Sequence, residues 1–217
     1  MPIPWIHSEP APFNLAAIPP PKDRYGLTLN GEPTYATCAP LATGMMTAYW
    51  HQQRPPAWGE LQPQTLIDAN ASLFTERGIG IHQFEDDLRS AGYNFRTFRD
   101  TDFGTLRQVA GRQPVIAHVR TGFEPGGMPH AVVVYKMDED NVYVADPSTA
   151  TEYAVPVPQF QRVWETATGE QGGTFYTIAP SPSPWKEAKK QAGKQEVRPP
   201  VPAQVAQQQR PAWRRGR

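Results

Sequence analysis

The chain contains one cysteine, Cys38, so no disulfide can form within it. It begins without a basic, apolar signal segment, and it has no apolar run long enough to cross a membrane. These absences predict a cytoplasmic protein, or one that is exported or delivered without a classical signal peptide. His and Cys residues show no metal-ligand spacing, and no glycine-rich phosphate loop is present. We therefore expect no structural metal and no cofactor.

The chain has no net charge, with 21 Lys and Arg against 21 Asp and Glu, but the two signs are unevenly distributed. Residues 181–217 hold nine of the cations and two of the carboxylates, so a basic tail follows an acidic body. This tail is rich in Pro and Gln and poor in apolar residues, which predicts disorder. It is either a solvated linker or a docking peptide whose cations suit an acidic partner.

Proline is concentrated at the opposite end of the chain. Seven prolines fall within residues 1–24, which predicts an extended arm. The arm either covers an apolar patch of the body or crosses an active-site groove. Residues 25–180 then remain as one predicted domain, long enough to bury a core.

Apolar periodicity divides this domain into a helical first half and a β-rich second half. Three- and four-residue spacing predicts helices over residues 38–50, 63–74, 80–92 and 103–110. Apolar runs bounded by turn residues predict strands over 93–98, 114–119, 131–135, 141–145, 152–155 and 174–178. Helices followed by antiparallel strands indicate an α+β fold.

The residues able to perform chemistry stand at the ends of these elements. Cys38 begins its helix, where unpaired backbone N–H groups and the helix dipole favour the thiolate. His130 begins one strand and Asp146 ends the next, and the turn residues 138–141 predict a hairpin that brings both together. A nucleophile, a base and a group that orients the base are what covalent acyl transfer requires.

In order and spacing, these pieces resemble the papain-like cysteine peptidases, specifically the bacteriocin-processing (double-glycine leader) branch and its stand-alone relatives. The resemblance covers roughly residues 25–180 and rests on Cys38-Ala39-Pro40, the strand 114–118, the His130 strand and Asp146-Pro147. It implies a papain-like fold, with the nucleophile helix packed on a C-terminal antiparallel sheet. It also implies a peptide or protein substrate, cleaved by Cys38, His130 and Asp146 through a thioester acyl-enzyme.

Two positions depart from that family's pattern. Ala39 stands where members usually have Gly, a difference of one methyl group. Glu32 stands six residues before Cys38, where the family has a Gln whose amide helps to hold the oxyanion. A carboxylate donates no hydrogen bond unless it is protonated, and its charge opposes an oxyanion. Asn30, two residues earlier, is the alternative donor.

Three hypotheses remain open. The first is a cysteine peptidase, a hydrolase. The second keeps Cys38, His130 and Asp146 but gives the acyl group another acceptor, as a delivered acyltransferase or deamidase effector would. The third, favoured by Glu32, is a catalytically impaired peptidase-like protein that only binds its partner.

Overall fold

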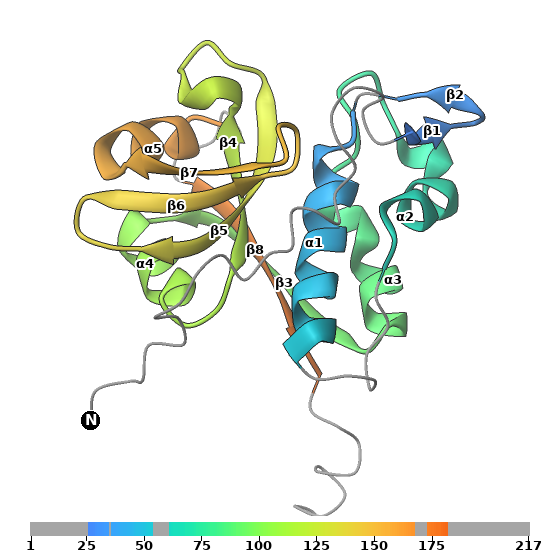
Figure 1. Ribbon diagram of the computed structural model, residues 1–217, viewed down its shortest axis with the longest axis horizontal. Coiled ribbons are helices and arrows are strands. Elements are labelled where there is room, and N and C mark those ends of the chain that lie inside the picture. The colour runs from blue at the N-terminus through green and yellow to red at the C-terminus, as the bar shows by residue number, and fades with distance from the viewer. Residues whose placement is uncertain (1–25, 35, 54–60, 168–172, 182–217) are drawn as a thin grey trace, which may run out of the picture. The chain divides into compact units, whose positions relative to one another are not determined.

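The computed structural model describes residues 26–34, 36–53, 61–167 and 173–181. The predicted arm (1–24) and the basic tail from residue 182 onward lie outside these ranges. Within them, three helices precede a sheet of antiparallel strands, so the predicted α+β fold is confirmed (Figure 1). No helix in the described ranges is long and apolar enough to span a membrane.

The main sheet has six strands in the spatial order β3-β8-β4-β5-β6-β7, and every neighbouring pair is antiparallel. Its strands are β3 (Tyr93–Thr101), β4 (Val115–Arg120), β5 (Pro129–Met137), β6 (Asn141–Asp146), β7 (Thr151–Pro156) and β8 (Gly173–Pro180). β5 and β6 form the predicted hairpin. β8, the last strand in the chain, inserts between β3 and β4 and completes the sheet.

The described helices are α1 (Cys38–Gln53), α2 (Pro63–Ala69), α3 (Glu85–Ser90), α4 (Phe103–Ala110) and α5 (Val157–Glu165), with 3₁₀ turns η3 (Ala71–Leu73), η4 (Ile81–Phe84) and η5 (Thr121–Phe123). The prediction that α1 begins at the cysteine is confirmed. The helix predicted over 63–74 was too long. It stops at Ala69 because the Asn70 side chain donates to the Leu66 carbonyl, which the next helical N–H would otherwise bond. The same side chain also donates to Asp87, and both bonds are 2.9 Å long.

The helix predicted over 80–92 was wrong in type over its first turn. This turn is the 3₁₀ helix η4, followed by α3. Ile81 and Phe84 are both fully buried. A 3₁₀ turn places side chains three residues apart in line, so it points both at the core more directly than an α-helix would.

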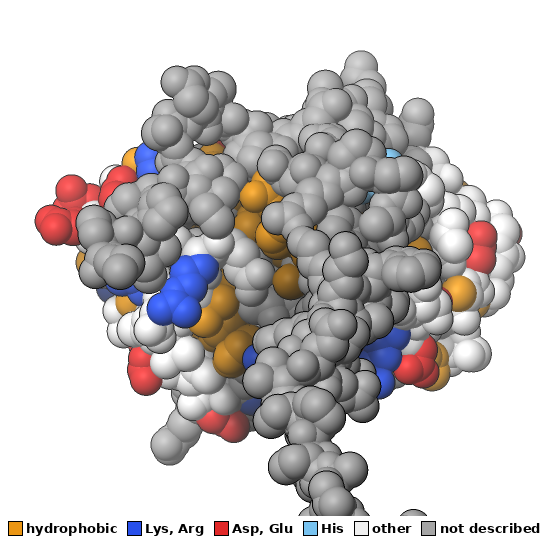
Figure 2. Space-filling model, turned by 90° about the horizontal axis from the view of Figure 1, so that it is seen from below, with side chains coloured by type: hydrophobic (Ala, Val, Ile, Leu, Met, Phe, Trp, Pro, Cys, Tyr) orange, Lys and Arg blue, Asp and Glu red, His pale blue; other side chains and the backbone are white. Residues whose placement is uncertain are grey.

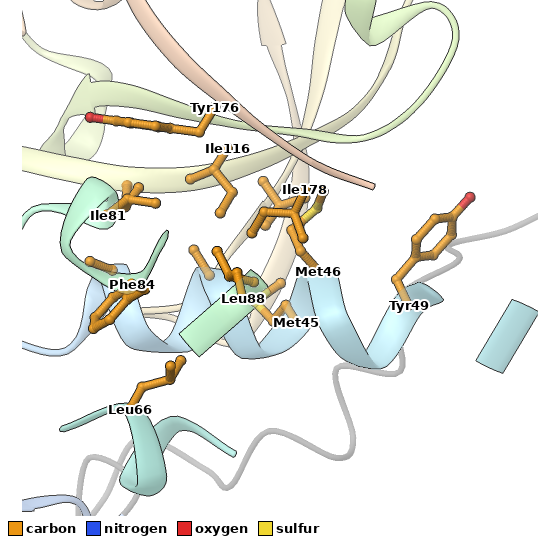
Figure 3. Close-up of a cluster of buried hydrophobic side chains, with 14 of the residues drawn as sticks. Met45, Met46, Tyr49, Leu66, Ile81, Phe84, Leu88, Ile116, Tyr176 and Ile178 are labelled. Carbon is orange, nitrogen blue, oxygen red and sulfur yellow. The ribbon is translucent and has the colours of Figure 1, made fainter. Parts of the chain in front are cut away.

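Both faces of the sheet are covered by helices. On β5, Val133 joins the core beneath α1, while Val132 and Val134 join the core beneath α4 and α5, because successive side chains of a strand point to opposite faces. Figure 3 shows the first core, in which side chains of α1 and α3 meet side chains of the sheet. Its labelled members are Met45, Met46, Tyr49, Leu66, Ile81, Phe84, Leu88, Ile116, Tyr176 and Ile178.

A small hairpin precedes α1. Its strands, β1 (Thr28–Leu29) and β2 (Glu32–Pro33), are joined by Asn30 and Gly31, whose φ values of 54° and 85° are typical of a tight hairpin turn. The Gln64 side chain of α2 bonds both the N–H and the carbonyl of Thr28, each at 3.0 Å. This pair of bonds ties the hairpin to the helices.

On one face of the molecule the charges of the described residues are mixed. On the face drawn in Figure 2, acidic and basic side chains of the described residues lie interspersed around apolar ones.

Candidate active site

Cys38 is the first residue of α1 and is partly buried. The helix that carries it packs on the sheet through small and flexible side chains, among them Ala39, Ala42 and Met46. In Figure 1 the N-terminal end of α1 lies beside the first residues of β5. The sulfur therefore faces the first residues of β5, with the N–H groups of a helix start behind it.

His130 lies at the start of β5 and Asp146 at the end of β6, as the hairpin prediction requires. Their side chains are buried and joined by a bond of 2.8 Å between His130 Nε2 and Asp146 Oδ1. The Cys38 thiol lies against the same imidazole, and each group shifts the pKa of the other. Because Nε2 is bonded to Asp146, Nδ1 is the ring nitrogen left to face Cys38. The structure thus brings together all three residues singled out in the sequence.

Asp146 has two further partners. Its Oδ1 accepts the Ser148 N–H at 2.7 Å, and its Oδ2 accepts the Tyr153 hydroxyl. Sequence reasoning missed both. Asp146-Pro147-Ser148 carries a signal that could have found the first, since an Asp often bonds the N–H two residues on. Nothing in the sequence pattern pointed to Tyr153.

The three groups shift one another's ionisation. Burial opposes the Cys38 thiolate, but the bonded and charged His130 ring and the N–H groups of Ala131 and Ala39 outweigh it, so the pKa of the thiol is lowered. Burial opposes the His130 imidazolium too, but its bonds to Asp146 and Cys38 and their charges raise its pKa to about 9. Burial opposes the charged form of Asp146. The hydrogen bond to His130 and the His130 charge favour that form more, so the pKa of Asp146 is lowered. The pair of thiolate and imidazolium is therefore favoured near neutral pH.

Residues 36–168, more than half of the chain, match the model of the Peptidase C39 family. The chain belongs to the Peptidase C39 family. It is accordingly a cysteine peptidase by family, as the resemblance to the bacteriocin-processing branch predicted. No match was found among proteins with curated descriptions.

Similar solved structures include two peptidase structures. A C39-like peptidase from Bacillus anthracis has a TM-score of 0.50 and 14% identity over 68% of this chain and 90% of that chain. This likeness shows the papain-like C39 fold alone. The peptidase domain of Streptococcus ComA, a bifunctional ABC transporter involved in quorum sensing, covers 67% of this chain and 93% of its own, with 19% identity and a TM-score of 0.47.

The positions that depart from the C39 pattern differ in their surroundings. Ala39 is buried and its N–H faces the sulfur. Glu32 lies in β2 and Asn30 in the turn before it, and both side chains are exposed. Neither side chain makes a hydrogen bond with any part of the chain that the structure describes.

A second histidine stands near the C39 site. His118 on β4 pairs in register with Ala131, and its ring packs edge-on against Tyr176 with centroids 5.1 Å apart. Burial, followed by the charges of His82, His130 and Arg99, lowers its pKa to about 4. His118 is therefore neutral at physiological pH and leaves His130 as the charged imidazole beside Cys38. Within the described ranges no three His, Cys, Asp or Glu side chains could hold a metal ion.

Proposed function

We propose that this protein hydrolyses a peptide or protein substrate through a thioester acyl-enzyme. Cys38 is the nucleophile, His130 the general acid and base, and Asp146 the group that orients His130. One observation carries the proposal: the buried hydrogen bond between His130 and Asp146 lies beside Cys38 at a helix start, and the imidazole and the thiol shift each other's pKa.

In the first half of the reaction, the Cys38 thiolate attacks the substrate carbonyl carbon, and negative charge develops on the carbonyl oxygen. The Cys38 backbone N–H, which has no partner within α1 because it belongs to the first turn, receives that charge. The His130 imidazolium gives its proton to the leaving amine, which departs with the electrons of the broken C–N bond. The product is a thioester between Cys38 and the acyl part of the substrate.

In the second half, a water molecule attacks the thioester carbonyl while His130 takes a proton from the water. The C–S bond breaks, the carboxylic acid leaves, and the thiolate and imidazolium are restored. Asp146 accepts from Nε2 throughout, so Nδ1 faces the reacting atoms.

The assembled nucleophile is tested by the pH dependence of Cys38 alkylation with iodoacetamide. Because the pKa of the thiol is lowered, the alkylation rate should rise in a step well below the pH at which a free thiol ionises. In His130→Ala the imidazole and its charge no longer offset burial, so this step should move to the ordinary thiol range or above. At neutral pH we expect alkylation about tenfold slower, because about 100-fold less thiolate is partly offset by its greater nucleophilicity.

Intact-mass analysis supplies the readout and the control. One adduct should form, on Cys38, and unfolding should make Cys38 equally reactive in both proteins. A step that is the same with and without His130 would reject the ion pair. Peptide digests then separate the reaction types: new peptide termini support hydrolysis, whereas ammonia release or amine incorporation without new termini supports an acyltransferase or deamidase.

We further expect Glu32→Gln to raise kcat about tenfold with little change in KM. Glu32 occupies the position of the family's oxyanion amide, and Gln would replace an opposing charge with a donor; one such donor contributes about 10² where it is fixed. We expect the smaller gain because Glu32 is exposed and unbonded within the described chain.

Glu139→Gln is the matched control for this change. It removes the same charge at the exposed β5–β6 turn, at the opposite end of the hairpin from His130. An equal gain in kcat in both variants would mean that the change in net charge alone causes it. No gain in either would remove Glu32 from the oxyanion site.

A further inference from the structure

We propose that Tyr153 is a positioning residue of the active site, whose hydroxyl holds one oxygen of Asp146 so that the other faces His130. This inference rests on the proposed function and adds a fourth side chain to it.

The bonds to Asp146 hold its carboxylate at both oxygens. Oδ1 accepts from His130 Nε2 at 2.8 Å and from the Ser148 N–H at 2.7 Å, and Oδ2 accepts from the Tyr153 hydroxyl. Rotation of the carboxylate about its Cβ–Cγ bond would break all three bonds. The Ser148 N–H and the Tyr153 hydroxyl therefore fix the plane of the Asp146 carboxylate, and with it the direction in which Oδ1 faces His130.

The register of the β6–β7 hairpin explains why Tyr153 reaches Asp146. Tyr153 lies directly opposite Val144, and Asp146 lies directly opposite Thr151. Asp146 and Tyr153 are thus diagonal neighbours, and a diagonal lies within reach of an aromatic side chain. A tyrosine spans this diagonal with its hydroxyl at the carboxylate, which a shorter polar side chain would not do.

The Tyr153 ring is itself held in place. It packs edge-on against Phe123 of η5, with centroids 5.8 Å apart and planes at 86°. Phe123 is buried and has a φ of 53°. Its ring centroid lies 6.1 Å from that of Phe160 in α5. The Gln159 side chain donates to the Phe123 carbonyl at 3.3 Å. The hydroxyl is therefore carried by a ring that is anchored on two other elements.

The ionisation states of Tyr153 and Asp146 agree with a hydrogen bond that the tyrosine hydroxyl donates to the carboxylate. Burial, and then the neighbouring Asp146 carboxylate, raise the pKa of Tyr153, so the phenol keeps its proton. Asp146, whose pKa is lowered, stays ionised and can only accept. The same bond therefore also stabilises the charge that faces the His130 imidazolium.

The test compares Tyr153→Phe, which removes only the hydroxyl, with Tyr143→Phe. Tyr143 on β6 makes a like bond, 2.8 Å to Asp138 in the exposed β5–β6 turn, and does not contact the site. In Tyr153→Phe we expect kcat to fall about tenfold with KM little changed, since a bond to a charged group is lost. The alkaline limb of the pH profile, set by the His130 pKa of about 9, should move to lower pH because Asp146 holds the imidazolium less well. Tyr143→Phe should match the wild-type protein in kcat, in KM and in the position of the alkaline limb.

Two outcomes would overturn the inference. A lower melting temperature with kcat and the alkaline limb unchanged would reduce Tyr153 to a support of the fold. A limb that moves to higher pH would mean that the hydroxyl draws charge away from His130 instead of orienting its partner.

The inference can also fail separately from the proposed function. If the wild-type protein cleaves no peptide, the same variants are compared by Cys38 alkylation, where Tyr153→Phe should move the step to higher pH and Tyr143→Phe should not. If Tyr153→Phe does not fold, Phe123→Leu replaces it. That variant keeps the hydroxyl but removes the ring that anchors it, so a smaller loss of kcat in the same direction is expected, and an unchanged kcat would overturn the inference.

Discussion

Cys38→Ala should reduce peptide-bond cleavage by about 10⁶-fold, the scale on which removing a covalent nucleophile acts in other hydrolases. Without the sulfur no thioester forms, and the remaining oxyanion donor and binding contacts act only on attack by water. The measurement is single-turnover cleavage of a peptide library, read as new termini by mass spectrometry. The melting temperature should change little, because Cys38 is only partly buried at the first residue of α1.

The double variant Cys38→Ala/His130→Ala is the control for this result. Residues that act as one unit are not additive, so the double variant should be no slower than Cys38→Ala alone. A substantial rate in Cys38→Ala would assign cleavage to another group and overturn the mechanism. Equal and negligible rates in the wild-type protein and the variant would support the impaired binding protein.

Gly173→Ala should destabilise the fold by about 3 kcal/mol, through overpacking and a strained hydrogen bond. A Cβ on Gly173 would lie 2.0 Å from Trp164 Cε2. The Trp164 ring is fully buried, and its N–H donates to the Thr174 carbonyl at 3.0 Å, so it cannot move aside without losing that bond. The effect corresponds to about 10 °C in the melting temperature of a domain of this size.

Gly126→Ala is the matched control. A Cβ at Gly126 meets nothing within 4 Å, and Gly126 itself has no positive φ. Its stability should stay within about 0.5 kcal/mol of the wild-type protein. Thermal unfolding followed by circular dichroism measures both. Equal melting temperatures for the two variants would mean that the indole has room to shift.

Local patterns predicted the parts of the site that depend on short stretches of chain. The helix begins at Cys38 because apolar spacing and a proline in the first turn both favour that start. The turn residues between β5 and β6 predicted the hairpin, and with it the meeting of His130 and Asp146. These predictions were confirmed because a hairpin fixes its own register.

The sequence could not predict other features, because they depend on contacts between segments that are far apart in the chain. The end of α2 is set by Asn70, whose partner Asp87 lies in a different helix. The sequence showed Val132, Val133 and Val134 as one apolar run, but their division between two cores follows from helices on both faces of the sheet. The diagonal from Tyr153 to Asp146 follows from the strand register.

The sequence by itself determined the fold class, the helix that carries Cys38, and the hairpin that carries His130 and Asp146, because each is encoded in local periodicity and turn chemistry. Tertiary structure alone decided that the N-terminus of α1 meets the start of β5 at His130, since that contact joins residues about 90 apart in the chain. It also decided how the charges of the site are balanced, because the pKa shifts of Cys38 and His130 arise from burial and from each other.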